Sequence, residues 1–342
     1  MGENVETNKR IVLRRVAQGM PAPDDFELVE SPLPQPGDGE VMVRTIYLSL
    51  DPYMRGGMGN PKSVGKVPSG GVVGEVVASR HPAFAAGQLV CQYVGGYGWQ
   101  SYGVAPGAEL RVLDPDLVPI STSLGVVGMP GVTAYFGLLA VGQPVAGETV
   151  VVSAAAGAVG AVVGQIAKIK NCRAVGIAGS DEKCDYVVEE LGFDAAVNYR
   201  AGDLDGALAK ACPDGVDVYF DNVGGPVLDA VLAQINRGAR ISLCGSIAEY
   251  NDPPGTLQGT RINRYVQGGL AHMVGMNQGQ YQDRHEEALA LLAWWVRGGQ
   301  VKYREDLVEG LEKAPDAFIG MMQGRNFGKL LVRVSPDPTR DR

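Results

Sequence analysis

The sequence predicts an α/β protein in which a doubly wound parallel sheet is combined with a smaller β-rich domain. From Thr149 onward, short apolar runs alternate with segments whose apolar residues recur at helical spacing, and this alternation is typical of a parallel sheet built from βαβ units. The first third consists instead of short strand-like runs separated by Pro and Gly clusters, which indicates a β-rich region. A length of 342 residues is too great for one compact core and predicts two domains.

The expected elements follow from these patterns in chain order. In the β-rich region, strands are predicted at residues 11–15, 26–30, 40–48, 70–79 and 88–94. In the parallel sheet, strands are predicted at residues 149–152, 173–179, 195–199, 216–221 and 239–244, with helices from residue 158, over 226–235 and over 283–296. The tail at residues 326–334 reads as a strand that rejoins the first domain.

A small-residue turn follows the first strand of the parallel sheet. Ala154, Gly157 and Gly160 form the pattern A-x-x-G-x-x-G, with alanine where the dinucleotide fingerprint has its first glycine. Backbone N–H groups at a helix start are unpaired and carry the positive end of the helix dipole, so a diphosphate can bind there. Small residues also serve simply to pack a helix on a strand, and the pattern alone leaves a turn without any ligand as the alternative.

The end of the second strand favours NADPH over NADH. A site that prefers NAD has an acidic residue there to hold the ribose hydroxyls, whereas this chain has Gly179 followed by Ser180, the expected N-cap of the next helix. Lys183 lies in the first turn of that helix, where a cation faces the positive end of the dipole. The ribose phosphate of NADPH would supply the missing anion. An ordinary solvated lysine is the alternative interpretation.

Composition excludes several classes of protein. A net charge of −8 with no basic run argues against a nucleic-acid or anionic-membrane partner. Residues 1–10 have no apolar segment of the kind found in signal peptides, and no run approaches the ~20 apolar residues of a membrane span. The five cysteines form no C-x-x-C pair, which is typical of reduced thiols in a cytoplasmic protein.

Several stretches together resemble the zinc-independent branch of the medium-chain dehydrogenase/reductase superfamily. This branch contains leukotriene B4 dehydrogenase, prostaglandin reductase and plant double-bond reductases, and the bacterial NADPH-dependent curcumin reductase type is the nearest. The stretches are 48–55 (LSLDPYMR), 128–135 (GMPGVTAY), 154–160 (AAAGAVG), 164–168 (GQIAK), 221–225 (DNVGG) and 324–329 (GRNFGK). The resemblance implies a GroES-like catalytic domain at residues 1–130 and 310–342. It also implies an inserted Rossmann NADPH-binding domain at residues 131–309, and a homodimer.

The resemblance also implies which residues contact the cofactor. Residues 155–160 match the diphosphate turn, Lys183 the anchor of the 2′-phosphate, and Tyr199 the residue beside the adenosine phosphate. Together with Gly179, the implied contacts are Met129, Thr133, Ala155, Ala156, Gly157, Ala158, Val159, Gly160, Lys183, Tyr199, Asn222, Cys244, Gly245, Ser246, Ile247, Tyr250 and Asn326. Arg261 replaces a tyrosine of many relatives, and residues 268–272 (GGLAH) replace a bulkier run. A roomier substrate pocket is therefore expected.

No zinc site is expected. A catalytic zinc needs Cys and His or Glu ligands that converge on one open position, and the zinc branch carries a Gly-His-Glu motif early in its catalytic domain. The corresponding stretch here, residues 70–75 (GGVVGE), has no histidine, and none of His81, His272 and His285 has a cysteine at ligand spacing.

Without a Lewis acid, carbonyl reduction or alcohol oxidation lacks its polarising group, so an activated alkene is the better substrate. The sequence therefore predicts NADPH-dependent reduction of the C=C bond of α,β-unsaturated ketones and aldehydes. Hydride would add to the β-carbon, and a tyrosine or water would protonate the resulting enolate. The candidate catalytic residues are Tyr53 and Tyr250. Wall packing is the alternative role for Tyr53, and contact with the cofactor ribose is the alternative for Tyr250.

Two other functions are compatible with the same motifs. A quinone reductase of the same superfamily would share the fold and the cofactor. A non-catalytic NADPH-binding protein would keep the nucleotide turns but would not oxidise NADPH with any enone. The polar loop at residues 51–55 argues mildly against the non-catalytic alternative.

Overall fold

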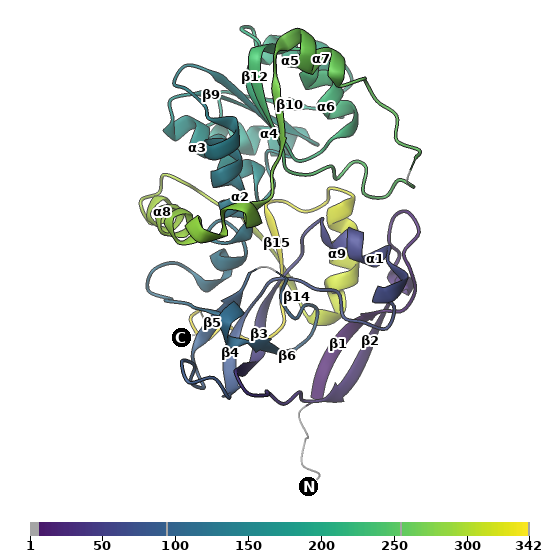
Figure 1. Cartoon of the computed structure of the whole chain (residues 1–342), viewed down its shortest axis with the longest axis vertical. Coiled ribbons are helices and arrows are strands. Elements are labelled where there is room, and N and C mark those ends of the chain that lie inside the picture. Colours follow the sequence, from purple (N-terminus) through teal and green to yellow (C-terminus); the bar gives the residue numbers. More distant parts are fainter. Residues whose placement is uncertain (1–6, 94, 254, 341–342) are drawn as a thin grey trace. The chain divides into compact units, whose positions relative to one another are not determined.

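The computed structural model describes residues 7–93, 95–253 and 255–340 and divides into two compact units (Figure 1). Unit 1 comprises Met1–Leu124, Glu305–Asn326 and Leu330–Arg342. Unit 2 comprises Gly125–Arg304 and Phe327–Lys329. The chain therefore leaves unit 1 at Gly125, forms almost all of unit 2, returns to unit 1 at Glu305, and contributes Phe327–Lys329 to unit 2 on its way to the end.

Unit 1 is built on a seven-stranded sheet in the order β14-β15-β3-β4-β5-β7, with β6 paired to β3, and on a two-stranded antiparallel sheet of β1 and β2. Its strands are β1 (Thr7–Leu13), β2 (Phe26–Pro32), β3 (Glu40–Ser49), β4 (Val72–Ser79), β5 (Leu89–Gln92), β6 (Tyr102–Pro106), β7 (Arg111–Val112), β14 (Glu305–Glu309) and β15 (Lys329–Arg333). Its α-helices are α1 (Met54–Met58) and α9 (Ala314–Met322), and short 3₁₀ helices cover Pro23–Asp25, Pro61–Ser63, Gly107–Glu109, Ile120–Leu124 and Leu311–Lys313.

The returning tail completes this sheet. Strand β15 pairs antiparallel with β3, with Leu331 opposite Ser49 and Val332 opposite Leu48, which confirms that the tail rejoins the β-rich unit. The strand predicted at 88–94 is shorter, since β5 ends at Gln92, and residue 94 lies outside the described residues. Strand β1 begins at Thr7, before the predicted residue 11, because pairing with β2 extends over its polar start.

Unit 2 contains the predicted parallel sheet. Six strands lie in the order β10-β9-β8-β11-β12-β13, and every pairing is parallel. They are β8 (Thr149–Ser153), β9 (Arg173–Ala178), β10 (Ala195–Asn198), β11 (Val216–Asp221), β12 (Ile235–Leu243) and β13 (His272–Gly275). Counted from β8, the order is 3-2-1-4-5-6, that of a dinucleotide-binding sheet, in which ligands bind beyond the carboxyl ends of the strands where the order reverses, here between β8 and β11.

The helices of unit 2 connect these strands. They are α2 (Met129–Phe136), α3 (Gly160–Ile169), α4 (Asp181–Asp185), α5 (Leu204–Ala211), α6 (Gly225–Leu232), α7 (Asn263–Gly269) and α8 (His285–Arg297), with π-helical turns at Gly137–Gly142 and Tyr186–Glu190 and a 3₁₀ helix at Gln278–Arg284. Helix α3 begins two residues later than predicted, and α8 follows the 3₁₀ helix instead of beginning at residue 283.

The predicted boundary between helix 226–235 and strand 239–244 is wrong. Helix α6 ends at Leu232, and β12 already begins at Ile235. The pairing of β11 with β12 changes register between Val216 and Val218, and Gly238 has a positive φ of 82°. An irregularity of this kind lets the strand accommodate extra residues, so the polar stretch before residue 239 is strand.

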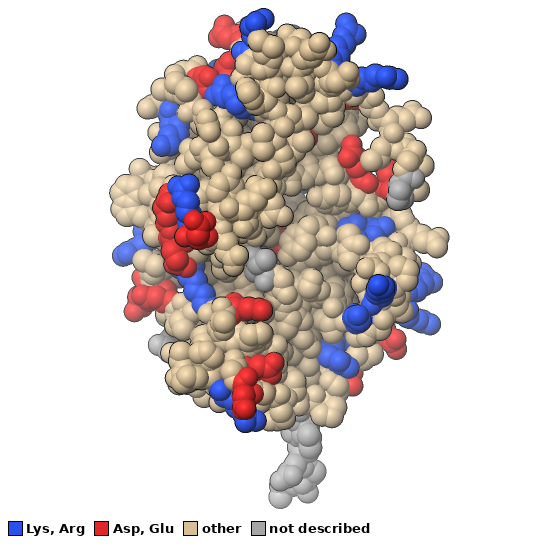
Figure 2. All heavy atoms as spheres, in the orientation of Figure 1, with Lys and Arg blue, Asp and Glu red and all other residues tan. Residues whose placement is uncertain are grey.

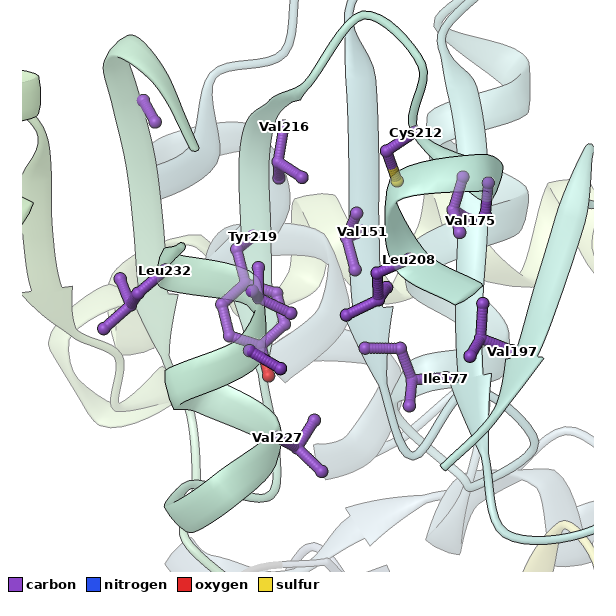
Figure 3. Close-up of a cluster of buried hydrophobic side chains, with 14 of the residues drawn as sticks. Val151, Val175, Ile177, Val197, Leu208, Cys212, Val216, Tyr219, Val227 and Leu232 are labelled. Carbon is purple, nitrogen blue, oxygen red and sulfur yellow. The ribbon is translucent and has the colours of Figure 1, made fainter. Parts of the chain in front are cut away.

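The core of unit 2 lies between the sheet and the helices that follow β10 and β11. Figure 3 shows Tyr219 of β11 among Val151, Ile177, Leu208 and Val227, with its hydroxyl on the side away from Val216. These side chains are all at least nine-tenths buried, and burying such apolar surface stabilises the fold by about 25 cal/mol per Å². The core therefore fixes the strands whose ends carry the site.

Two further features are the apolar character of the helices and the charged side chains on one face of the molecule. Among the described residues, no helix combines the length and apolar character needed to cross a membrane. On the face seen in Figure 2, Lys and Arg side chains are interspersed with Asp and Glu side chains.

Candidate active site

The turn between β8 and α3 depends on the close approach of two small residues. Ala154 has a left-handed φ of 52°, a conformation that costs a non-glycine residue about 1–2 kcal/mol. A Cβ atom added at Gly160 would lie 2.4 Å from the carbonyl oxygen of Ala154, so only glycine fits there. The N–H of Gly157 donates to the same carbonyl at 2.9 Å, and the turn is thereby fixed.

This turn leaves open N–H groups at the start of a ten-residue helix. In the described part of the chain, the N–H groups of Ala158, Val159 and Gly160 have no acceptor, and the first bond of the helix runs from Ala161 to the Gly157 carbonyl at 3.0 Å. Ala155 and Ala156 are almost fully buried. The turn therefore offers an anion its backbone, not its side chains, at the positive end of α3.

The returning chain lies against the same turn. Within unit 2, the N–H of Gly328 donates to the Ala156 carbonyl at 3.2 Å, and Gly157 and Gly328 form a parallel bridge. Asn326, the predicted cofactor contact of the tail, comes two residues earlier in the chain.

The end of β9 brings three of the predicted residues together. A Cβ atom added at Gly179 would lie 3.1 Å from the Tyr199 ring, so the missing side chain allows Tyr199 to stand beside the strand end. The Ser180 hydroxyl accepts the N–H of Lys183 at 3.3 Å, which confirms Ser180 as the N-cap of α4. Lys183 therefore has a fixed backbone in the first turn, next to the Gly179 and Tyr199 pair.

Aromatic rings and further cations surround this strand end, and sequence reasoning placed Arg200 there but missed Phe327 and Arg304. The Lys183 ammonium is 6.0 Å from the centroid of the Phe327 ring, and the Arg304 guanidinium is 3.8 Å from the same centroid. Arg200 donates to the Tyr199 hydroxyl at 3.2 Å. Arg200 was detectable as the residue directly after Tyr199, whereas the place of Phe327 follows from the long-range return of the tail. Cation–π contacts of this kind hold charged groups in place.

The segment after β12 is tied to the turn after β11. The N–H groups of Cys244 and Gly245 donate to the Asp221 carbonyl at 2.8 and 3.1 Å, and the N–H of Ile247 donates to the Asn222 carbonyl at 3.4 Å. The Asn222 side-chain amide in turn donates to the Ser153 carbonyl at 2.8 Å. The predicted residues Asn222 and Cys244 to Tyr250 therefore belong to one connected group at adjacent strand ends.

The Tyr250 hydroxyl is bound within this group. It accepts the N–H of Ser246 at 3.4 Å, and a Cβ atom at Gly245 would lie 3.1 Å from it. Burial raises the pKa of Tyr250, and burial likewise raises the pKa of Cys244 to about 12. Both groups are therefore protonated at neutral pH, and the Tyr250 hydroxyl has a proton to donate.

Met129 and Thr133 lie one turn apart on α2. The Thr133 hydroxyl donates to the Met129 sulfur at 3.7 Å, and Thr133 is 6% exposed. The two predicted residues therefore share one face of this helix.

Tyr53 belongs to unit 1, where it directly precedes α1. Its side chain is 44% exposed, and burial of the hydroxyl, together with the nearby Asp51 carboxylate, raises the pKa of Tyr53. The Asp51 carboxylate accepts a hydrogen bond from the Ser49 hydroxyl. Arg55, in contrast, is buried and donates to the carbonyls of Ala17 and Gly19, so within unit 1 it packs the loop.

The positions that correspond to a zinc motif are closely packed. A Cβ atom at Gly70 would lie 2.8 Å from the Met54 methyl group, and one at Gly71 would lie 3.1 Å from the Tyr93 carbonyl oxygen. His285 is engaged with the Gln278 carbonyl at 2.9 Å. Within residues 7–93, 95–253 and 255–340, no three His, Cys, Asp or Glu side chains are grouped to hold a metal ion.

Comparison with known proteins agrees with this geometry. The N-terminal domain of oxidoreductase family matches residues 9–113, and the zinc-binding dehydrogenase family matches residues 158–294. The NADPH-dependent curcumin reductase of Escherichia coli is 45% identical over 98% of this chain and 100% of its own. Prostaglandin reductase 1 of Oryctolagus cuniculus is 43% identical over 94% of this chain and 92% of its own. The chain belongs to the medium-chain dehydrogenase/reductase superfamily.

Within this superfamily, the relatives point to the branch of the curcumin and prostaglandin reductases, which confirms the resemblance predicted from the sequence. The crystal structure of CurA from Vibrio vulnificus in complex with NADPH is 44% identical and superposes with a TM-score of 0.90, covering 96% of this chain and 100% of that chain. The superfamily fold, a dinucleotide-binding sheet with a separate β-rich unit, is therefore that of the present structure.

Proposed function

We propose that this chain is an NADPH-dependent oxidoreductase that reduces the C=C bond of α,β-unsaturated ketones and aldehydes. The observation that carries the proposal is the set of strand ends in unit 2, where the open N–H groups follow β8, Lys183 follows β9 and Tyr250 follows β12 of a dinucleotide-binding sheet. Relatives named NADPH-dependent curcumin reductase and prostaglandin reductase 1, which match this chain over nearly its whole length, support it.

The residues present fit NADPH. The open N–H groups at residues 158–160 suit the diphosphate. Lys183 suits the 2′-phosphate, because the lysine ammonium is a compact positive charge that can pair with this anion. Met129, Thr133 and the segment from Cys244 to Tyr250 would face the nicotinamide half. Bound NADPH supplies a hydride to the β-carbon of the alkene.

The protein's own chemical task is to stabilise the enolate oxygen. A hydroxyl that is protonated and held in place can donate a hydrogen bond to this oxygen as its charge develops. Tyr250 meets both conditions, because a tyrosine hydroxyl is protonated at neutral pH, burial raises its pKa further, and its oxygen accepts the Ser246 N–H. Tyr53 is the second candidate, since burial raises the pKa of its hydroxyl while part of the residue stays exposed beside the buried Asp51. Either tyrosine, or water, then delivers the proton to the α-carbon.

We also assign the two units their roles. Unit 1 is the GroES-like catalytic domain, predicted at residues 1–130 and 310–342, and unit 2 is the Rossmann domain, predicted at 131–309. The functional form is proposed to be a cytoplasmic homodimer without nucleic-acid or membrane partners. Light scattering of the purified protein tests the dimer.

Activity is expected to be independent of metal. Gly70 and Gly71 stand at closely packed positions where a zinc motif would have its histidine, and the reaction needs only hydrogen-bond donors at the enolate oxygen. Exhaustive chelation should leave turnover with an enone unchanged, and elemental analysis should find no stoichiometric zinc. Loss of turnover that added zinc restores would contradict this mechanism.

The proposed function is tested by NADPH consumption with a matched panel of enones, enals and quinones, with the products analysed. We expect turnover of enones and enals that yields saturated ketones and aldehydes. Turnover restricted to quinones would contradict the proposal in favour of a quinone reductase. Tight NADPH binding with no turnover of any compound would instead indicate a non-catalytic protein.

A further inference from the structure

The last residue of β11 is a buried carboxylate with an unusual number of partners. Asp221 is 1% exposed. Its Oδ1 atom accepts hydrogen bonds from the Ser153 hydroxyl at 3.1 Å and from the Tyr219 hydroxyl at 2.8 Å. The same atom accepts the N–H groups of Val223 at 2.9 Å and Gly224 at 3.0 Å. A buried carboxylate is tolerated only when it is satisfied in this way.

These bonds join three strand ends. Ser153 ends β8, and its hydroxyl also accepts the N–H of Asn222 at 2.9 Å. Val223 and Gly224 form the turn after β11. The Asp221 backbone carbonyl accepts the N–H groups of Cys244 and Gly245, the first residues after β12. One residue thus connects the start of the diphosphate turn, the Asn222 turn and the nicotinamide-side segment.

We propose that Asp221 is a positioning residue that holds these three turns in the arrangement that binds the cofactor, without contacting the cofactor itself. The proposal rests on NADPH binding in the proposed function, but it does not depend on which alkene is reduced. Residues that hold metal ligands in place without touching the metal typically change affinity or activity by about 10–100-fold when they are replaced. We expect an effect of this order for a residue that orients a cofactor site in the same way.

The charge of Asp221 also reaches the candidate donors. After burial, the Asp221 carboxylate is a further cause of the raised pKa of Cys244, and it contributes to the raised pKa of Tyr250. The carboxylate therefore favours the protonated hydroxyl that the mechanism needs.

Strand β11 offers a matched control at its other end. Asp217 also bridges two neighbouring segments, because its carboxylate accepts the Thr149 N–H at 2.9 Å and the Asn236 side-chain amide at 2.8 Å. These bonds lie at the amino ends of β8 and β11, away from the carboxyl ends where ligands bind in such sheets. Losing Asp217 therefore removes a smaller bridge of the same strand but leaves the proposed site intact.

The experiment measures the NADPH dissociation constant and the thermal unfolding temperature of Asp221→Ala, Asp221→Asn and Asp217→Ala in the full chain. We expect Asp221→Ala to raise the NADPH dissociation constant at least ~10-fold, and Asp221→Asn, which keeps the acceptor oxygen, to recover part of that loss. Asp217→Ala should also lower the unfolding temperature, by less than Asp221→Ala, and should leave the NADPH dissociation constant unchanged within about 2-fold.

Equal effects of Asp221→Ala and Asp217→Ala on NADPH binding would overturn the proposal, because they would indicate a purely structural role. If Asp221→Ala does not fold, Ser153→Ala decides instead. It removes one bond to Oδ1 and the acceptor of the Asn222 N–H, and we expect a rise of at least ~3-fold. Unchanged binding in Ser153→Ala would contradict the proposal. The binding assay contains no alkene. NADPH binding can therefore test the role of Asp221 even if the protein does not reduce enones.

Discussion

Replacing Tyr250 by phenylalanine is expected to lower kcat for enone reduction at least ~10-fold while NADPH affinity changes little. The hydroxyl is held by the Ser246 N–H and remains protonated because burial raises its pKa. The hydroxyl can therefore donate a hydrogen bond to the enolate oxygen. The phenylalanine variant lacks this hydrogen bond, which exists mainly in the transition state. A lost oxyanion donor typically costs ~10²–10³ in turnover. A loss smaller than this, of at least ~10-fold, is expected here because a ribose hydroxyl of the cofactor and water can also stabilise the enolate.

Tyr53→Phe is the matched comparison, since it removes the same atom from the second candidate. Single-turnover hydride transfer should be measured for both variants, with NADPH binding determined separately. We expect Tyr53→Phe to retain the parent rate. Parent rates in both variants would mean that neither tyrosine stabilises the enolate, and a slow Tyr53→Phe with a fast Tyr250→Phe would reverse the assignment.

Replacing Lys183 by alanine is expected to weaken NADPH binding at least ~10-fold and to leave NADH binding nearly unchanged. Losing a charge-assisted contact to a phosphate typically costs about 1.5–3 kcal/mol, and only NADPH carries the 2′-phosphate. The N-cap fixes the backbone of Lys183 in the first turn of α4, and the Lys183 ammonium lies 6.0 Å from the centroid of the Phe327 ring. Titration of both cofactors against the variant measures the difference.

Lys210→Ala is a suitable control, because Lys210 is an exposed lysine of the same unit in the last turn of α5. It changes the net charge by the same amount at a different place. Lys183→Ala could weaken NADPH and NADH binding equally, or Lys210→Ala could weaken NADPH binding as much as Lys183→Ala does. Either result would contradict the assignment of Lys183 to the 2′-phosphate.

The parts of the fold that the sequence predicts are those with strong local patterns. Strand β11 has the predicted bounds, because Val216, Val218, Tyr219 and Phe220 are apolar and all its residues except Asp217 are buried between neighbouring strands. The turn between β8 and α3 is predictable from its small residues, and the N-cap role of Ser180 from its position before an acidic first turn. These features depend on residues close together in the chain.

Features that depend on distant residues or local irregularity were not predicted. The contact of Gly328 with the Ala156 carbonyl and the stacking of Arg304 on Phe327 arise only when the tail returns. The early start of β12 depends on the irregular pairing near Gly238. The left-handed conformation of Ala154 could not be predicted from the sequence either, because alanine rarely adopts a positive φ.

The central claim, hydride addition to the β-carbon, is tested most directly with NADPH that carries deuterium at C4 of the nicotinamide. One enone is reduced to completion, and the position of deuterium in the product is determined by NMR. The account predicts a saturated ketone with deuterium on the carbon β to the carbonyl and a solvent proton on the α-carbon. Deuterium on the carbonyl carbon of an unsaturated alcohol would contradict it.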